Sequence, residues 1–142
     1  MLCDAASVRE GLLSVLGAGI TVVWRESFPA PLFADLAAQF ERLDVAASRY
    51  DVSISARPVE GGESVFNAEL QLQVEARDDD RPQMIPLIVP LRDVGVPGPG
   101  SYILEVFVDK VVRGSLRFDA VLMPPAGHEE GNARAVSATP PL

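Results

Sequence analysis

Apolar and polar side chains alternate along much of the chain with a period of two residues. The alternation is cleanest over 66–75, and it recurs over 50–57 and over 113–122. Because successive side chains of a strand point to opposite faces, each of these segments is predicted to be a strand with one buried and one solvated face. Residues 101–108 carry apolar side chains on both faces, which favours a central strand covered on both sides.

Turn-forming residues separate these segments. Glu60-Gly61-Gly62 lies between two predicted strands, residues 96–100 alternate Pro with Gly, and Asp109 to Gly114 is a predicted hairpin connection. The strands recur at intervals of about 10–18 residues, which is typical of an antiparallel sandwich or barrel and not of β-α-β units.

The segment 84–92 is predicted to be an edge strand. Its odd-numbered residues are apolar, and Pro86 and Pro90 stand four residues apart on the other face. Their missing N–H groups therefore lie on one side of the strand, and we expect that side to face outward. Two interpretations stay open together: the prolines are merely tolerated at an edge, or they prevent edge-to-edge pairing.

Residues 31–43 allow two interpretations. Pro31 suits the first position of a helix, and the apolar side chains that follow it recur at helical spacing. The same segment also alternates as a strand, with apolar residues from Leu32 to Phe40 on one face. The residues taken alone favour the helix.

Composition and charge limit the classes of function. The 142 residues suit one globular domain, since hydrophobic residues make up 48% of the chain. The formal net charge of −8 disfavours nucleic acid and anionic membrane surfaces as partners, and it favours a basic protein face. Residues 123–142 are rich in Pro and poor in bulky apolar side chains, which predicts a disordered tail after a domain of residues 1–122.

The beginning of the sequence lacks the pattern of a secretory signal. Asp4 comes early, and Arg9 and Glu10 directly precede the apolar run of 12–24. Gly17 and Gly19 interrupt that run, which is also shorter than the roughly 20 residues that a membrane helix needs. We therefore expect a cytoplasmic protein without membrane contact.

The scarcity of histidine and cysteine removes most acid–base and nucleophilic chemistry. His128 is the only histidine and lies in the predicted tail. Cys3, the only cysteine, then has no imidazole to activate it, and it is expected to be a small buried side chain of the first strand. Lys110 follows Asp109 in a predicted hairpin, where nothing desolvates it for Schiff-base chemistry.

Two further features have plain structural interpretations. Gly17-Ala18-Gly19 lacks the third glycine of a dinucleotide fingerprint, so it is interpreted as a bend or bulge in a long strand. Trp24 comes near the end of the same apolar run and is expected in the core or at its rim, in preference to a ligand platform.

Carboxylates offer the remaining candidates. Asp78, Asp79 and Asp80 occupy a predicted loop of the kind that holds Ca²⁺ in C2-like sandwiches, yet they lack EF-hand spacing and are interpreted as a solvated acidic turn. Glu105 is the nearest candidate for a buried acid, and it is expected instead to point outward and pair with an arginine. No catalytic, cofactor-binding or metal-binding residue is therefore assigned, and no cofactor is expected.

The chain resembles an uncharacterised family of small bacterial proteins with a domain of unknown function. The resemblance begins with the pattern CDxA…GLLSVLGAG, continues through the strand and glycine turn of 50–62, and ends at 99–109. The matching residues outside the middle segment are Asp4, Ala6, Gly11, Leu13, Ser14, Leu16, Gly17, Gly19, Pro29, Pro99, Gly100, Tyr102, Val108 and Asp109. It covers 1–122 and implies an all-β sandwich of about eight strands, without an activity or ligand.

The resemblance changes one prediction. In such sequences the segment after the proline is similar to a strand, so we expect 32–42 to be a strand. The predicted fold is an antiparallel β-sandwich of about eight strands, of an Ig- or C2-like Greek-key type. The expected function is a non-catalytic cytoplasmic protein-interaction or accessory module with a protein partner. The alternatives are a small-ligand or Ca²⁺-binding sandwich and, less favoured, a carboxylate-based enzyme.

Overall fold

The computed structural model describes residues 1–42, 46–75 and 81–125, which form strands and no helix. The strands are β1 (Leu2–Cys3), β2 (Ala5–Arg9), β3 (Leu12–Leu16), β4 (Val22–Arg25), β5 (Ala30–Pro31), β6 (Asp35–Glu41), β7 (Arg49–Pro58), β8 (Phe66–Gln73), β9 (Met84–Pro90), β10 (Gly95–Val96), β11 (Gly100–Val108) and β12 (Val111–Leu122). The all-β prediction is confirmed. The strands outnumber the predicted eight because three of them have only two residues and the run of 12–24 is divided.

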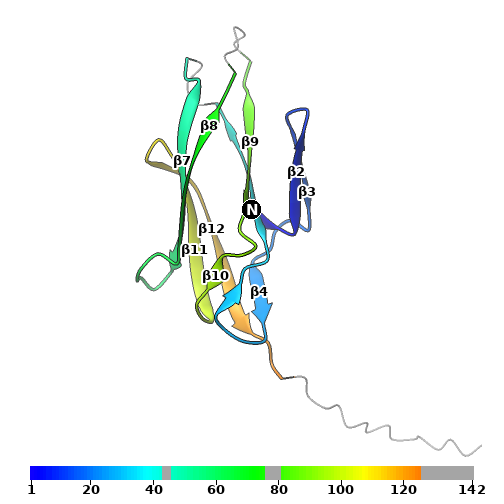
Figure 1. Cartoon of the computed structure of the whole chain (residues 1–142), viewed down its shortest axis with the longest axis vertical. Coiled ribbons are helices and arrows are strands. Elements are labelled where there is room, and N and C mark those ends of the chain that lie inside the picture. Colours follow the sequence, from blue (N-terminus) through cyan, green and yellow to red (C-terminus); the bar gives the residue numbers. More distant parts are fainter. Residues whose placement is uncertain (43–45, 76–80, 126–142) are drawn as a thin grey trace, which may run out of the picture.

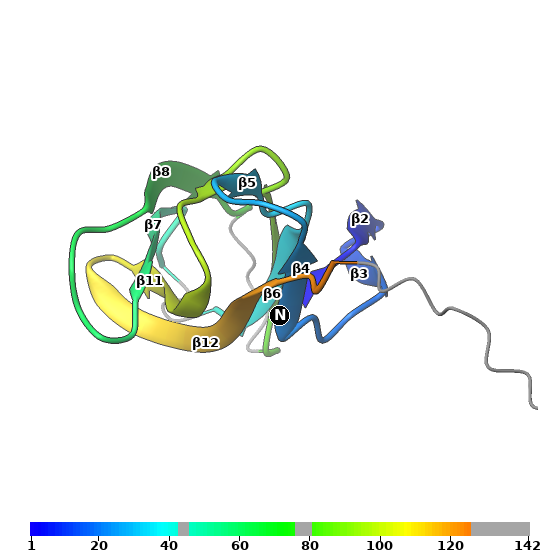
Figure 2. The same ribbon diagram turned by 90° about the horizontal axis from the view of Figure 1, so that it is seen from below.

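The largest sheet has five strands in the order β4-β12-β11-β7-β8. It curls, so that in Figure 2 its strands form a curved wall around one side of the core. Three of its long strands, β7, β8 and β12, are the segments predicted from alternation, and β11 is the segment predicted from its two apolar faces. β11 lies centrally between β7 and β12, as expected, and Leu104 at its middle is 1% exposed. The connection between β11 and β12 is tighter than predicted, since only Asp109 and Lys110 separate the two strands.

A three-stranded sheet, in the order β1-β6-β9, closes the other side of the core. The strand prediction for 32–42 is confirmed over β6, which begins at Asp35, and the helical alternative is wrong. β6 must supply main-chain hydrogen bonds to β1 on one side and β9 on the other, and that pairing overrides the local helix propensity. The core faces of both sheets join in one apolar cluster, which includes Leu36 of β6 and Leu104 of β11.

The edge-strand prediction for 84–92 is confirmed. β9 is the last strand of its sheet, and the N–H of Leu91 donates to the carbonyl of Ala34 at 3.1 Å. Main-chain groups of alternate residues point to the same side, so the odd-numbered residues of β9 face β6. Pro86 and Pro90 therefore lack their N–H groups on the outward side, as the sequence predicts.

The segment Gly17-Ala18-Gly19 separates two strands, and the prediction of one long bent strand is wrong. β3 ends at Leu16 and pairs with β2, whereas β4 begins at Val22 and joins the five-stranded sheet. Gly17 and Gly19 have φ values of +61° and +87°, a backbone conformation that glycine adopts readily. The pairing of β4 with β12 is parallel, which the prediction of an antiparallel fold did not include.

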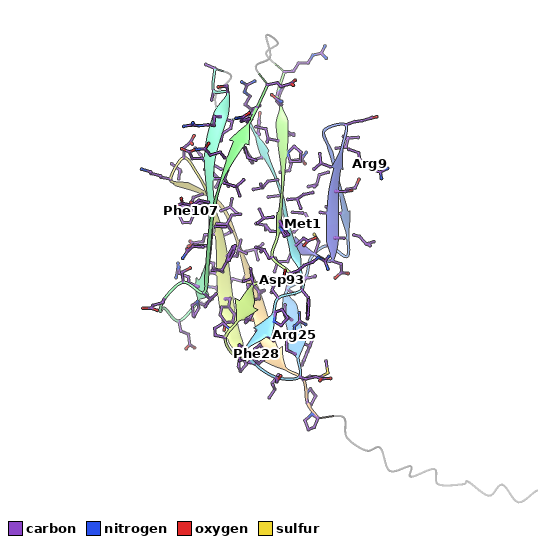
Figure 3. The ribbon with its side chains drawn as sticks, viewed as in Figure 1. Met1, Arg9, Arg25, Phe28, Asp93 and Phe107 are labelled. Carbon is purple, nitrogen blue, oxygen red and sulfur yellow. The ribbon has the colours of Figure 1, made fainter. Side chains whose placement is uncertain are left out.

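The hairpin of β2 and β3 projects from the body of the molecule, beside β6 and β9 (Figure 1). We call residues 5–16 the arm. In Figure 3, the labelled Arg9 of the arm lies on the opposite side of the molecule from Phe107 of β11. The two strands of the arm form a sheet of their own, so no third strand adds main-chain hydrogen bonds to it in the described structure.

Three predictions fall wholly or partly outside the described residues. These are the acidic loop of Asp78, Asp79 and Asp80, the position of His128, and the tail of 123–142 beyond residue 125. In the ranges that are described, no helix has the length and apolar character to cross a membrane.

Candidate interaction surface

The arm is a tight hairpin with large apolar side chains in water. Glu10 and Gly11 form its turn with φ values of +52° and +77°, the backbone of a two-residue type I′ turn. On the outer face, Leu12 is 70% exposed and Leu16 is 71% exposed. An isolated two-stranded hairpin is marginally stable in water, so an arm with this outer face is typical of a surface that another molecule covers.

The inner face of the arm covers the outer face of β6. Leu13 and Val15 alternate with the exposed leucines and are partly buried, as is Ala6, which pairs with Val15; Val8, which pairs with Leu13 on the same face, is 43% exposed. Ala37 lies on the face of β6 that points away from the core, yet it is completely buried. Because β2 is the arm strand that approaches β6 and β9, this burial indicates that the arm packs against the sheet.

Two charged side chains hold the base of the arm. Asp35 of β6 is 8% exposed, and its Oδ1 lies 3.2 Å from Nε of Arg92. The Arg92 guanidinium also donates through Nη2 to the main-chain carbonyl of Asp4, directly before the arm begins. Arg92 therefore connects the end of β9 to β6 and to the arm.

The main chain at the base is tied by further hydrogen bonds. The N–H of Asp4 donates to the carbonyl of Leu16 at 3.0 Å, and the N–H of Gly19 donates to the carbonyl of Leu2 at 3.0 Å. The side chain of Asp4 covers Gly17, so a Cβ at that position would lie 2.6 Å from Cγ of Asp4. These contacts fix the direction of the arm both where β2 begins and where β3 ends.

Cys3 is a buried structural side chain, as predicted. It is 0% exposed in β1, and its thiol donates to the carbonyl of Asp35 at 3.4 Å. Burial raises the pKa of the Cys3 thiol, and the negative charge of Asp35 adds to this effect. The reactive thiolate is therefore disfavoured, and Cys3 is unsuited to act as a nucleophile.

The raised thiol pKa predicts a loss of stability in alkali. The folded state keeps the Cys3 proton to a higher pH than the unfolded chain does, so its stabilising contribution is complete below the unfolded pKa of about 8.5 and falls as pH rises toward the folded pKa. Urea unfolding between about pH 7 and pH 10 should show this fall at a slope of up to about 1.4 kcal/mol per pH unit. Cys3→Ala should lose that slope, and an unchanged slope in the variant would contradict the assignment.

The other residues singled out in the sequence are not brought together. Glu105 points outward from β11 and pairs with Arg57, whose Nε lies 3.4 Å from Oε2, which confirms the prediction for this acid. Lys110 is exposed in the β11–β12 turn, and Trp24 is 49% exposed at the rim of the five-stranded sheet. Among the described residues, no group of three or more metal-ligating side chains converges.

Two hollows of the described surface bear on ligand binding. One of about 160 Å³ lies between the sheets and is lined mainly by apolar residues, including Leu36, Phe40 and Leu116. It is below the roughly 300–1,000 Å³ of a typical small-molecule site. The other, of about 480 Å³, lies over β7 and β8, where the carboxylates of Asp51 and Glu69 that line it are exposed to solvent. Neither hollow combines a large apolar cavity with buried polar groups.

The fold and the surface together define a small all-β domain that presents an apolar hairpin. The chain belongs to the family of unknown function DUF6941, whose family model matches residues 1–121. The resemblance to an uncharacterised domain is thereby confirmed. Comparison with curated proteins and with solved structures gives no significant match.

The arm explains the N-terminal pattern of that resemblance in physical terms. The turn at Gly11, the strand Leu12–Leu16 and the glycines after it form the second half of the arm and its base. Asp35 and Arg92 were missed by the sequence analysis, although Asp35 is a lone charge in the otherwise apolar stretch 32–38. The sequence held a second signal for the exposed surface, because β3 has apolar residues on both faces. A strand with one solvated face would alternate between apolar and polar residues.

Proposed function

We propose that this protein is a non-catalytic cytoplasmic interaction module whose arm binds a protein partner. The observation that carries the proposal is the exposure of Leu12 and Leu16 on a projecting hairpin. Burying a leucine side chain contributes about 1.5–3 kcal/mol, so a partner that covers both would gain a large part of its binding free energy there.

The chemistry of the described residues supports a role without catalysis. The Cys3 thiol is buried with a raised pKa, and Glu105 is engaged with Arg57. Asp35 is the one buried carboxylate in the described ranges, and the Arg92 charge compensates it. General acid–base catalysis needs a titratable group within reach of a bound substrate, and these groups lie in the packed base of the arm or on an open sheet face.

We also infer that the two main sheets form a β-sandwich of Greek-key type. This inference is supported by the apolar cluster shared between the sheets and by the pairing of β7 with β11, which are far apart in sequence. The arm is an addition to this architecture and not one of its layers.

Replacing both exposed leucines tests the interaction surface. Leu12→Ser/Leu16→Ser should weaken binding to the purified partner by about 100-fold or more, because two apolar contacts are lost. The matched control is Val111→Ser/Val112→Ser, which changes two exposed aliphatic residues, each 49% exposed, beside the turn of another hairpin. Calorimetry should give equal partner affinity for the control and the wild type.

Salt and turnover provide independent checks. With a net charge of −8, association with a basic partner face should slow as salt concentration rises.

Equal loss of affinity in Leu12→Ser/Leu16→Ser and in Val111→Ser/Val112→Ser would show that the arm is not the contact surface. Reproducible turnover of a substrate that disappears in Glu105→Gln would show that the protein is an enzyme.

A further inference from the structure

The strand β3 is nearly a palindrome. Residues 11–17 read Gly-Leu-Leu-Ser-Val-Leu-Gly, so the sequence is symmetric about Ser14 except that Leu13 matches Val15. Antiparallel pairing reverses the direction of one strand, and a palindromic strand therefore presents the same residues to a second copy of itself. Self-complementarity of this kind is what a two-fold symmetric contact requires.

The main-chain N–H and C=O groups that such pairing needs point outward from the edge of β3 that faces away from β2. A two-residue turn closes on a hydrogen-bonded pair, here Arg9 with Leu12, so every second residue of β3 directs its main-chain groups to β2. The hydrogen bond from the N–H of Asp4 to the carbonyl of Leu16 agrees with this phase. Leu13 and Val15 consequently direct their N–H and C=O groups away from β2, along the outer edge.

The arm is also electrically neutral in an acidic protein. The tip carries Arg9 and Glu10, and the base carries Asp4 and Arg92, so each end has one charge of each sign. Two copies with a net charge of −8 each repel one another, and contact through the arm avoids adding to that repulsion. An antiparallel alignment also brings the Arg9 end of one arm to the Asp4 end of the other.

We propose that β3 pairs antiparallel with β3 of a second copy of this chain, about a two-fold axis at Ser14. This inference rests on the proposed function, because it takes the arm as the contact surface. It names a second copy in place of a basic protein face, so added salt, which screens the like charges, should strengthen the association. Leu13 of each copy then exchanges main-chain hydrogen bonds with Val15 of the other, and Leu12 lies beside Leu16 across the interface. Each copy contributes one five-residue strand to this contact, so we expect a weak dimer that dissociates on dilution.

Cysteine cross-linking tests the register. In the proposed dimer the two copies of Ser14 form a non-hydrogen-bonded pair with Cα atoms about 4.5–5.5 Å apart, within the range of a disulfide. Ser14→Cys should therefore give an oxidised dimer about tenfold faster than Ser7→Cys. Ser7 is the matched control, because it is exposed, lies opposite Ser14 on the same face of the arm, and is separated from its own copy by roughly 14 Å in the dimer.

Sedimentation measures dimer formation without cross-linking, in chains that carry no added cysteine. Val15→Pro removes an outward N–H and should abolish concentration-dependent dimer formation, whereas Val15→Thr keeps the N–H and should dimerise. Equal cross-linking of the two serine variants, or a monomer at all concentrations, would overturn the second copy as partner. The proposal that the arm binds a protein partner would survive that result if Leu12→Ser/Leu16→Ser weakened binding to a protein other than a second copy. It would fail if the variant bound that protein as tightly as the wild type does.

Discussion

Replacing Arg92 with Met should lower the free energy of unfolding by about 2–3 kcal/mol, because it leaves Asp35 buried without its countercharge. Asp35 is only 8% exposed, and its Oδ1 has no well-aligned hydrogen-bond donor among the described residues. Removing one partner of a fully buried ion pair costs about 3–5 kcal/mol, and the Arg92 side chain is half exposed, which reduces the expected loss. The variant also loses the hydrogen bond that holds the carbonyl of Asp4.

A double variant separates the buried charge from the loss of packing. Asp35→Leu/Arg92→Met replaces both partners by apolar side chains and should recover most of the stability, since no uncompensated charge remains. Arg117→Met, at an exposed position of β12, controls for the general effect of changing arginine to methionine. Urea denaturation measures all three variants. A double variant as unstable as Arg92→Met would show that the charge of Asp35 is not the cause.

The strands of the core could be predicted from the sequence because their burial is periodic. β7 alternates between more and less buried positions along most of its length, and β12 does so over its second half; each was predicted from the alternation of apolar and polar residues. The edge position of β9 followed from the spacing of its prolines, since only an outward side tolerates missing N–H groups. For β6 the resemblance was needed, because its alanine-rich sequence has a helical propensity that only tertiary pairing overrides.

The interaction surface could not be predicted, because it depends on contacts between distant segments. The burial of Asp35 and Ala37 requires the arm to fold over β6, and nothing within 35–41 indicates which segment covers them. The apolar run of 12–24 suggested one long strand, whereas its first part projects into solvent as β3. Exposed apolar residues have the same sequence pattern as core residues, so hydrophobicity alone assigns an arm to the core.

Replacing Gly17 with Ala should lower the free energy of unfolding by about 2–3 kcal/mol, from backbone strain together with a steric clash. Its φ of +61° disfavours a residue with a Cβ, and that Cβ would meet the carboxylate of Asp4 and lie 2.6 Å from its Cγ. Gly19→Ala is the matched control, because Gly19 also has a positive φ, of +87°, and its Cβ would meet nothing within 4 Å.

The difference between these two glycine variants measures how firmly Asp4 holds the base of the arm. Gly19→Ala should cost about 1 kcal/mol from backbone strain alone, so the remainder in Gly17→Ala belongs to the displaced carboxylate. In a chain that also carries Asp4→Ala, Gly17→Ala should cost no more than backbone strain, because no carboxylate is left to displace. Thermal and urea unfolding of the single and double variants measure this as a double-mutant cycle. Because the displaced side chain belongs to the residue that begins the arm, Gly17→Ala should also weaken partner binding more than Gly19→Ala does. Equal stability and equal binding in the two variants would contradict this account of the base.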